Sequence, residues 1–196
     1  MRIPLLIAFT FLATLAASGP ARLAAATPTS PLPSLGLPAE GKWNFHNGPE
    51  YPGAKGKVTL AANTDPALAD DPLVQTLATL SYDFTNGGRY VAAHTPTDIP
   101  DGTEEIRVRV TSAAAGPVSI RITDATGQTL TLQTAYTQEG EWQTLRFPLT
   151  GKIKNHFGGK NDGNIHFPIK KLALLVHKGG RATPAGSLTF TKFTLL

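Results

Sequence analysis

The chain has 196 residues, no cysteine, and 18 Lys and Arg against 14 Asp and Glu, a formal net charge of +4. The absence of cysteine excludes disulfides and cysteine catalysis, so a packed core or a bound ion must provide stability. No run of Lys and Arg interleaved with aromatic residues is present, so we expect no nucleic-acid partner.

The N-terminus has the layout of a secretory signal peptide. Arg2 is followed by an apolar stretch, Ile3 to Ala17, and Ala24-Ala25-Ala26 offers a small-residue cleavage site, with cleavage after Ser18 as the alternative. The stretch is short for a bilayer, and no other one approaches that length, so we predict a signal peptide over 1–26 and no membrane span. The expected location is secreted, periplasmic or extracellular.

Residues 27–40 are rich in Pro, Ser and Thr and predict a semi-extended linker. From residue 41 to 196, short β segments alternate with turn residues, which predicts one domain. Only Asp65–Thr76 has helical character, and its two prolines limit it to a turn or two. The predicted strands are Lys42–His46, Lys57–Ala61, Leu77–Phe84, Arg89–His94, Glu105–Thr111, Val118–Thr123, Gln128–Tyr136, Trp142–Leu149, Ile169–His177 and Ser187–Leu195.

So many strands with almost no helix indicate an all-β fold, which we predict to be a single-domain, jelly-roll-like β-sandwich. Alternation then assigns the faces, since successive side chains of a strand point to opposite sides. Ile106, Val108 and Val110 predict one core face, and the same pattern places Trp142 and Arg146 on an outer face.

An enzymatic site is not evident from the residues. Glycosidases need two carboxylates across a cleft, yet the acidic pairs stand at strand ends or in turns. There is no G-x-S-x-G elbow, and the five histidines lack the H-x-H or H-x-x-x-H spacing that is typical of a local zinc site. We therefore predict no catalytic residue and leave metal ligands unassigned.

Two polar segments are candidates for binding. His156–Pro168 combines glycines with Asn161, Asp162 and His166, which suit either a calcium ion or sugar hydroxyls, or else a surface loop held by its own hydrogen bonds. Asn47–Gly56 contains Glu50, which either rims a cleft or is a paired charge at the entry to the first strands.

Several segments resemble one family when read in order. They are Trp43-x-Phe45 with Gly48-Pro49-Glu50-Tyr51-Pro52-Gly53, Tyr82-Asp83-Phe84-Thr85-x-Gly87-Gly88-x-Tyr90, Arg121-Ile122-x-Asp124-Ala125-Thr126-Gly127-Gln128, Glu141-Trp142-Gln143, and His156-x-Gly158-Gly159-x-Asn161-Asp162-Gly163-x-Ile165-His166. Together they are similar to the jelly-roll carbohydrate-binding modules of the galactose-binding-like fold in bacterial polysaccharide-degrading enzymes.

The resemblance implies a non-catalytic module that binds a polysaccharide or other glycan. Many modules of this fold hold a structural calcium through an acidic residue in the last strand, but the last strand here carries Lys192 and no carboxylate. We therefore expect no cofactor, with a structural calcium as the alternative that the last strand does not support. We expect the module to act alone or with a separate glycan-degrading enzyme or surface.

Sugar binding needs an aromatic face and planar polar groups. Trp142, flanked on its predicted outer face by Arg121, Arg146 and Asp83, meets that need, and the arginines would favour an acidic glycan; a solvated face with a Trp covering an edge is the alternative. The predicted carbohydrate-binding residues are Trp142, Arg121, Arg146, Asp83, Asn161, Asp162, His166 and Glu50. The competing interpretations are a structural or protein-interaction sandwich and, third, a small glycoside hydrolase or lyase.

Overall fold

A computed structural model describes residues 34–35 and 42–196. One short 3-10 helix, η1 (Pro66–Leu68), is present among them, and otherwise the described chain forms strands and connecting loops. The strands are β1 (Ser34–Leu35), β2 (Asn44–His46), β3 (Lys55–Ala62), β4 (Thr76–Asp83), β5 (Tyr90–Ile99), β6 (Glu105–Ser112), β7 (Gly116–Thr123), β8 (Thr129–Tyr136), β9 (Gln143–Pro148), β10 (His156–Phe157), β11 (Ile169–His177) and β12 (Ala185–Leu195).

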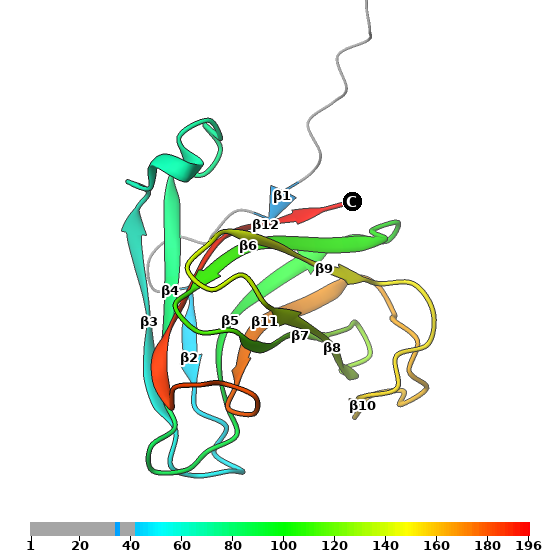
Figure 1. The fold of residues 1–196 in the computed structure, drawn as a ribbon. Coiled ribbons are helices and arrows are strands. Elements are labelled where there is room, and N and C mark those ends of the chain that lie inside the picture. The colour runs from blue at the N-terminus through cyan, green and yellow to red at the C-terminus, as the bar shows by residue number, and fades with distance from the viewer. Residues whose placement is uncertain (1–33, 36–41) are drawn as a thin grey trace, which may run out of the picture. The chain divides into compact units, whose positions relative to one another are not determined.

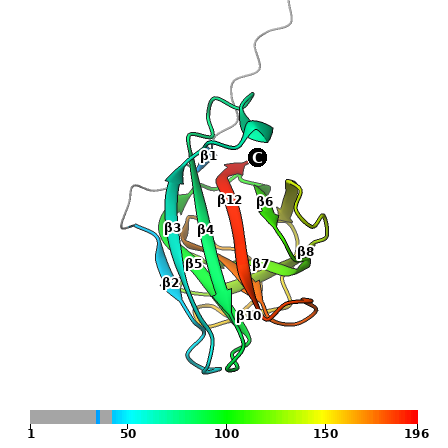
Figure 2. The same ribbon diagram turned by 60° about the vertical axis from the view of Figure 1, so that its left-hand side comes forward.

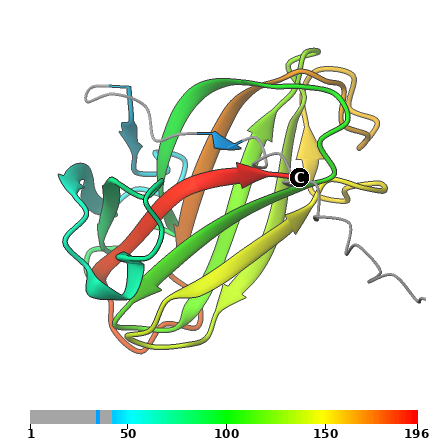
Figure 3. The same ribbon diagram turned by 90° about the horizontal axis from the view of Figure 1, so that it is seen from above.

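The strands form two antiparallel sheets (Figure 1). Sheet A has the order β3-β4-β12-β6-β9, with β1 beside the end of β12, and sheet B has the order β10-β8-β7-β11-β5-β2. Figure 2 shows β3, β4 and β12 side by side, and Figure 3 shows β12, β6 and β9 together in the same layer. The predicted all-β sandwich is confirmed.

The core lies between the two sheets because one side of nearly every strand is apolar. In β6, Ile106, Val108 and Val110 are buried, and in β7, Val118 and Ile122 are buried from the other sheet. The alternation that predicted these faces is thus confirmed.

The predicted segments differ from the observed ones at a few places. β5 continues to Ile99, and a two-residue strand, β10, lies inside the segment predicted as a loop. Residues 34–35 belong to the predicted linker, but the structure pairs them with β12. Residues 1–26 and the remainder of the predicted linker fall outside the described residues. Within the described part of the chain, no helix has the length and apolar character needed to cross a membrane.

Candidate functional site

A groove of about 200 Å³ lies on the outer face of sheet B. Its floor is apolar and consists of Ala92 on β5 with Ala173 and Leu175 on β11. Leu175 pairs with Ala92 in the register of the two strands, so these side chains are neighbours. The alanine side chains are too short to fill the space between longer neighbours, and the sheet surface is therefore hollowed here.

One wall of the groove is built from Tyr90 and His46, whose rings lie 12° from parallel with centroids 6.1 Å apart. The Tyr90 hydroxyl donates a hydrogen bond to the Glu50 carboxylate and accepts one from Arg121 Nη1 at 3.2 Å. His94 continues this wall, with its ring centroid 6.4 Å from that of His46.

The titration of this wall follows from its contacts. Burial, and then the hydrogen bond to Glu50, raises the pKa of Tyr90. The same hydrogen bond, donated by the tyrosine, lowers the pKa of Glu50. A neutral tyrosine therefore donates to an ionised Glu50, which holds the phenol ring in place beside the groove.

The opposite wall carries Phe157, an aromatic side chain that remains 54% exposed. Phe157 belongs to β10, the short strand that extends the β8 edge of sheet B, and it pairs with Thr129. Since paired residues share a face, Phe157 lies on the outer side of the sheet with Thr129 and lines the groove.

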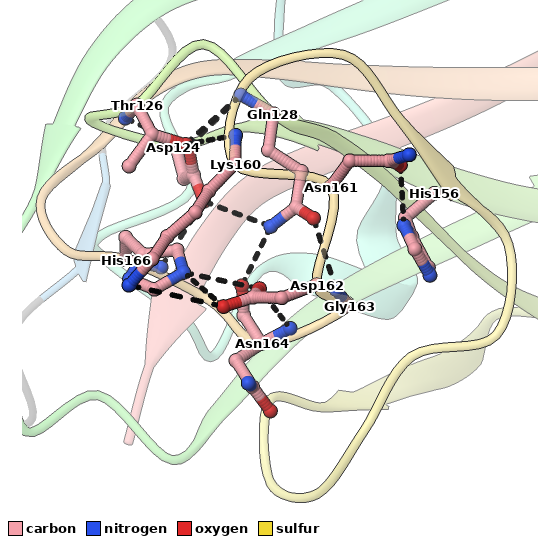
Figure 4. A network of polar contacts seen from close by, with 10 residues as sticks. All are labelled: Asp124, Thr126, Gln128, His156, Lys160, Asn161, Asp162, Gly163, Asn164 and His166. Carbon is pink, nitrogen blue, oxygen red and sulfur yellow. Dashed lines mark hydrogen bonds and ion pairs between the residues drawn. The ribbon is translucent and has the colours of Figure 1, made fainter.

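A buried carboxylate organises the loop from which β10 projects (Figure 4). Asp124, only 2% exposed, accepts five hydrogen bonds: from the backbone N–H and hydroxyl of Thr126, from the backbone and side-chain N–H of Gln128, and from the backbone N–H of His166. Burial by itself raises the pKa of Asp124, but these bonds outweigh it and the pKa is lowered. The carboxylate therefore ties the turn between β7 and β8 to the segment before β11.

The fully buried Gln128 side chain extends this network into the loop. Its Nε2 donates to the Asn164 carbonyl at 2.7 Å, and its Oε1 accepts from the Gly163 N–H at 2.9 Å. Asp162 accepts from the Asn164 backbone N–H at 2.9 Å and faces His166 Nε2 at 3.0 Å, and chiefly the Asn164 bond lowers its pKa. The loop is thus held by its own hydrogen bonds, as one of the two predictions for it required.

The loop residues predicted to bind a ligand, Asn161, Asp162 and His166, are occupied with internal contacts. Asn161 Oδ1 lies 2.9 Å from His156 Nδ1, and Asp162 and His166 contact each other. Across residues 34–35 and 42–196, no group of three or more His, Cys, Asp and Glu side chains is arranged to hold a metal ion.

The structure divides the residues grouped around Trp142 between the two sheets. Trp142, Arg146 and Asp83 belong to the sheet A side, whereas Arg121 lies on β7 in sheet B. The prediction that Arg121 flanks Trp142 is therefore wrong, because the chain crosses from sheet B to sheet A between β8 and β9.

Trp142 itself is half-buried and held in place. Its indole N–H donates to the Asp65 carboxylate at 2.8 Å, and the Arg109 guanidinium lies 5.8 Å from its ring centroid. Asp65 caps η1, so Trp142 fastens that segment to sheet A, whereas Arg146 on β9 is exposed. Of the predicted set, Arg121 lines the groove and Glu50 stands behind its Tyr90 wall.

Five groove residues that carry aromatic or basic side chains were not predicted: Tyr90, His46, His94, Phe157 and Lys171. For Tyr90, His94 and Lys171 the sequence does contain a signal. Their strands, β5 and β11, each carry apolar residues on one face, and an aromatic, His or Lys residue together with alanine on the other. That pattern indicates strands with two covered or functional faces. Phe157 had no such signal because its strand has only two residues.

Comparison with solved structures identifies the fold. The chain superposes on the family 11 carbohydrate-binding module of a cellulosomal cellulase of Clostridium thermocellum with a TM-score of 0.54 and 15% identity, covering 85% of this chain and 93% of that one. This protein has the jelly-roll fold of carbohydrate-binding modules.

A second similar structure is an exo-beta-agarase, at a TM-score of 0.51 and 11% identity over 81% of this chain and 24% of that chain. The likeness therefore covers about a quarter of the agarase. No protein-family model matches the sequence, and no curated protein matches it. The predicted jelly-roll sandwich is confirmed by structure, and at these identities the similarity concerns the fold.

Proposed function

We propose that the protein is an exported, non-catalytic carbohydrate-binding module whose ligand lies in the groove on sheet B. The observation that carries this proposal is the composition of the groove. It combines the exposed ring of Phe157 with planar polar side chains, Arg121 and His94, above an apolar floor.

This combination suits a sugar ring. A pyranose has C–H groups that pack on an aromatic or aliphatic surface, and hydroxyls that need donors and acceptors fixed in position. The fold likeness to a carbohydrate-binding module supports the same conclusion, and an open groove across several strands suits a section of a polymer.

The test is a retention assay on the purified full chain in gels containing neutral or acidic polysaccharides. Phe157→Ala should weaken retention by about tenfold, because it removes a half-exposed apolar surface from the groove. Trp142→Ala is the matched control, since this aromatic belongs to the opposite sheet and should leave retention unchanged.

Three results would contradict the proposal. Retention lost with Trp142→Ala but kept with Phe157→Ala would move the ligand to sheet A. No retention by any polysaccharide, from a folded sample, would favour the protein-interaction role instead. Release of reducing ends or unsaturated uronates during the assay would contradict the non-catalytic assignment.

A further inference from the structure

The charged side chains that line the groove are all basic. Arg121 and Lys171 line it together with the imidazoles of His46 and His94. None of the ion pairs found in the described residues includes Arg121 or Lys171. The one nearby carboxylate with a contact to this wall, Glu50, accepts a hydrogen bond from the Tyr90 hydroxyl.

Arg121 is held in a defined orientation. Its Nη1 donates to the Tyr90 oxygen at 3.2 Å, its Nε lies 3.4 Å from Thr131 Oγ1, and its guanidinium carbon stands 5.0 Å from the Tyr90 ring centroid. These contacts use two of five N–H donors. A half-buried guanidinium with unused donors and no carboxylate partner is suited to bind a bidentate anion such as a carboxylate or sulfate.

Lys171 adds a second cation on the same face. It pairs with Thr123 on β7, two residues from Arg121, so both side chains project from the outer side of neighbouring strands. Burial, followed by the charge of Lys171, lowers the pKa of His94, whose Nδ1 is buried with no hydrogen-bond partner.

The positive charge continues along the sheet. A neighbouring hollow on the same face is lined by Arg89, His177 and Lys178. Arg89 and Lys178 carry the charge of this hollow, since burial, and then the charges of Arg121 and Arg181, lowers the pKa of His177 to about 4 and leaves its imidazole neutral at pH 7. Arg89 and Lys178 therefore extend the cationic surface beyond the groove itself.

From this juxtaposition we infer that the groove binds an acidic polysaccharide, whose carboxylate or sulfate groups contact Arg121 and Lys171. The inference rests on the proposed carbohydrate-binding function and specifies its ligand class. The exposed ring of Phe157 contacts the C–H face of the sugar, while the two cations select for charge.

The test compares polymers that differ only in charge. Polygalacturonate is set against its fully methyl-esterified form, and a sulfated carrageenan against its desulfated form, by affinity electrophoresis and calorimetry on the purified full chain. We expect binding to at least one charged polymer, about 10- to 100-fold weaker binding to its neutral counterpart, and weakening as salt rises. The charged polymer that is bound distinguishes carboxylate from sulfate.

Variants locate the contact. Arg121→Gln and Lys171→Gln should each weaken binding to the charged polymer by about tenfold and leave weak binding to the neutral one unchanged. Arg121→Lys keeps the charge without the planar fork and should fall between the two. Lys171 is exposed, so its substitution tests the inference even where changes at Arg121 impair folding. Arg146→Gln, on sheet A, is the matched control.

The outcomes separate the two proposals. Equal affinity for charged and neutral forms, or insensitivity to both Lys171→Gln and Arg121→Gln, overturns the acidic ligand but leaves carbohydrate binding in place. Loss of binding with Arg146→Gln alone overturns the assignment to this groove. Binding to none of the four polymers, nor to any neutral polysaccharide of the earlier screen, overturns both.

Discussion

Asp124→Asn perturbs the buried network that fixes the loop carrying β10. In the native protein Asp124 Oδ1 accepts from Thr126 and from the Gln128 backbone, while Oδ2 accepts from Gln128 Nε2 and the His166 N–H. An asparagine that keeps its oxygen toward Thr126 turns an NH₂ group toward the other two donors. Gln128 cannot compensate by rotating its amide, because its own oxygen and nitrogen are engaged by Gly163 and Asn164.

The expected cost follows from the two lost bonds. Hydrogen bonds to a charged group contribute about 1.5 kcal/mol each or more, so the free energy of unfolding at pH 7 should fall by about 3 kcal/mol. For a domain of this size, that loss corresponds to a midpoint lower by about 6–12 °C.

Denaturant unfolding measures this difference, with Asp162→Asn as the control in the same loop. Asp162 is more exposed, with a 30% exposed side chain, so its substitution should have a much smaller effect. Because the folded-state pKa of Asp124 is lowered, its contribution is present above the unfolded pKa near 4 and is lost as the pH falls through the folded value. The difference between wild type and Asp124→Asn should therefore shrink in acid.

A loss below about 1 kcal/mol, or a loss that is the same at pH 7 and at pH 3, would refute the reasoning. The first result would mean that the five hydrogen bonds add little beyond what water supplies. The second would mean that the ionised carboxylate is not the group that matters.

Three further predictions concern other parts of the fold. Tyr90→Phe removes the hydroxyl bonded to Glu50 and should lower the free energy of unfolding by about 1 kcal/mol in denaturant titrations. Gly53→Ala should lower it by about 2 kcal/mol or more, since Gly53 has φ +113° and an added Cβ would lie 2.0 Å from the Asn86 carbonyl oxygen; an unchanged denaturation midpoint would contradict this. Burial lowers the pKa of His177 from 6.5 to about 4, so between these pH values the unfolded chain binds a proton that the folded chain does not. The free energy of unfolding should therefore decrease as the pH is lowered from 6.5 to 4. His177→Asn should remove that component, at most about 3 kcal/mol, from the pH dependence of unfolding.

Much of the fold could be predicted because local alternation is strong. All ten predicted strands exist, with ends displaced by a few residues, since an apolar face every second residue is required to form this core. β10 escaped prediction because a two-residue strand has no periodicity. Its position depends on the distant Asp124 network.

The candidate site was harder to predict because a groove depends on strand order. Arg121 was recognised as outward-facing, yet its neighbours are set by β11 lying between β7 and β5, a pairing of strands far apart in sequence. Trp142 was predicted to bind sugar because it is an aromatic residue on an outer face. Its indole N–H instead donates a hydrogen bond to Asp65 and so holds the segment around η1 against sheet A. Alternation assigns a residue to the inner or outer face of its strand, but it does not say which outward-facing residues of other strands become its neighbours.

The alanines of the groove floor have a consequence for how this surface can diversify. Ala92 and Ala173 alternate along their strands with Val91, Leu172 and Leu174, which belong to the central core. Replacing a floor alanine by valine or leucine would change the depth of the groove without altering any side chain of that core. Related chains could therefore acquire shallower grooves for other ligands by single substitutions, while keeping the same side chains in the central core.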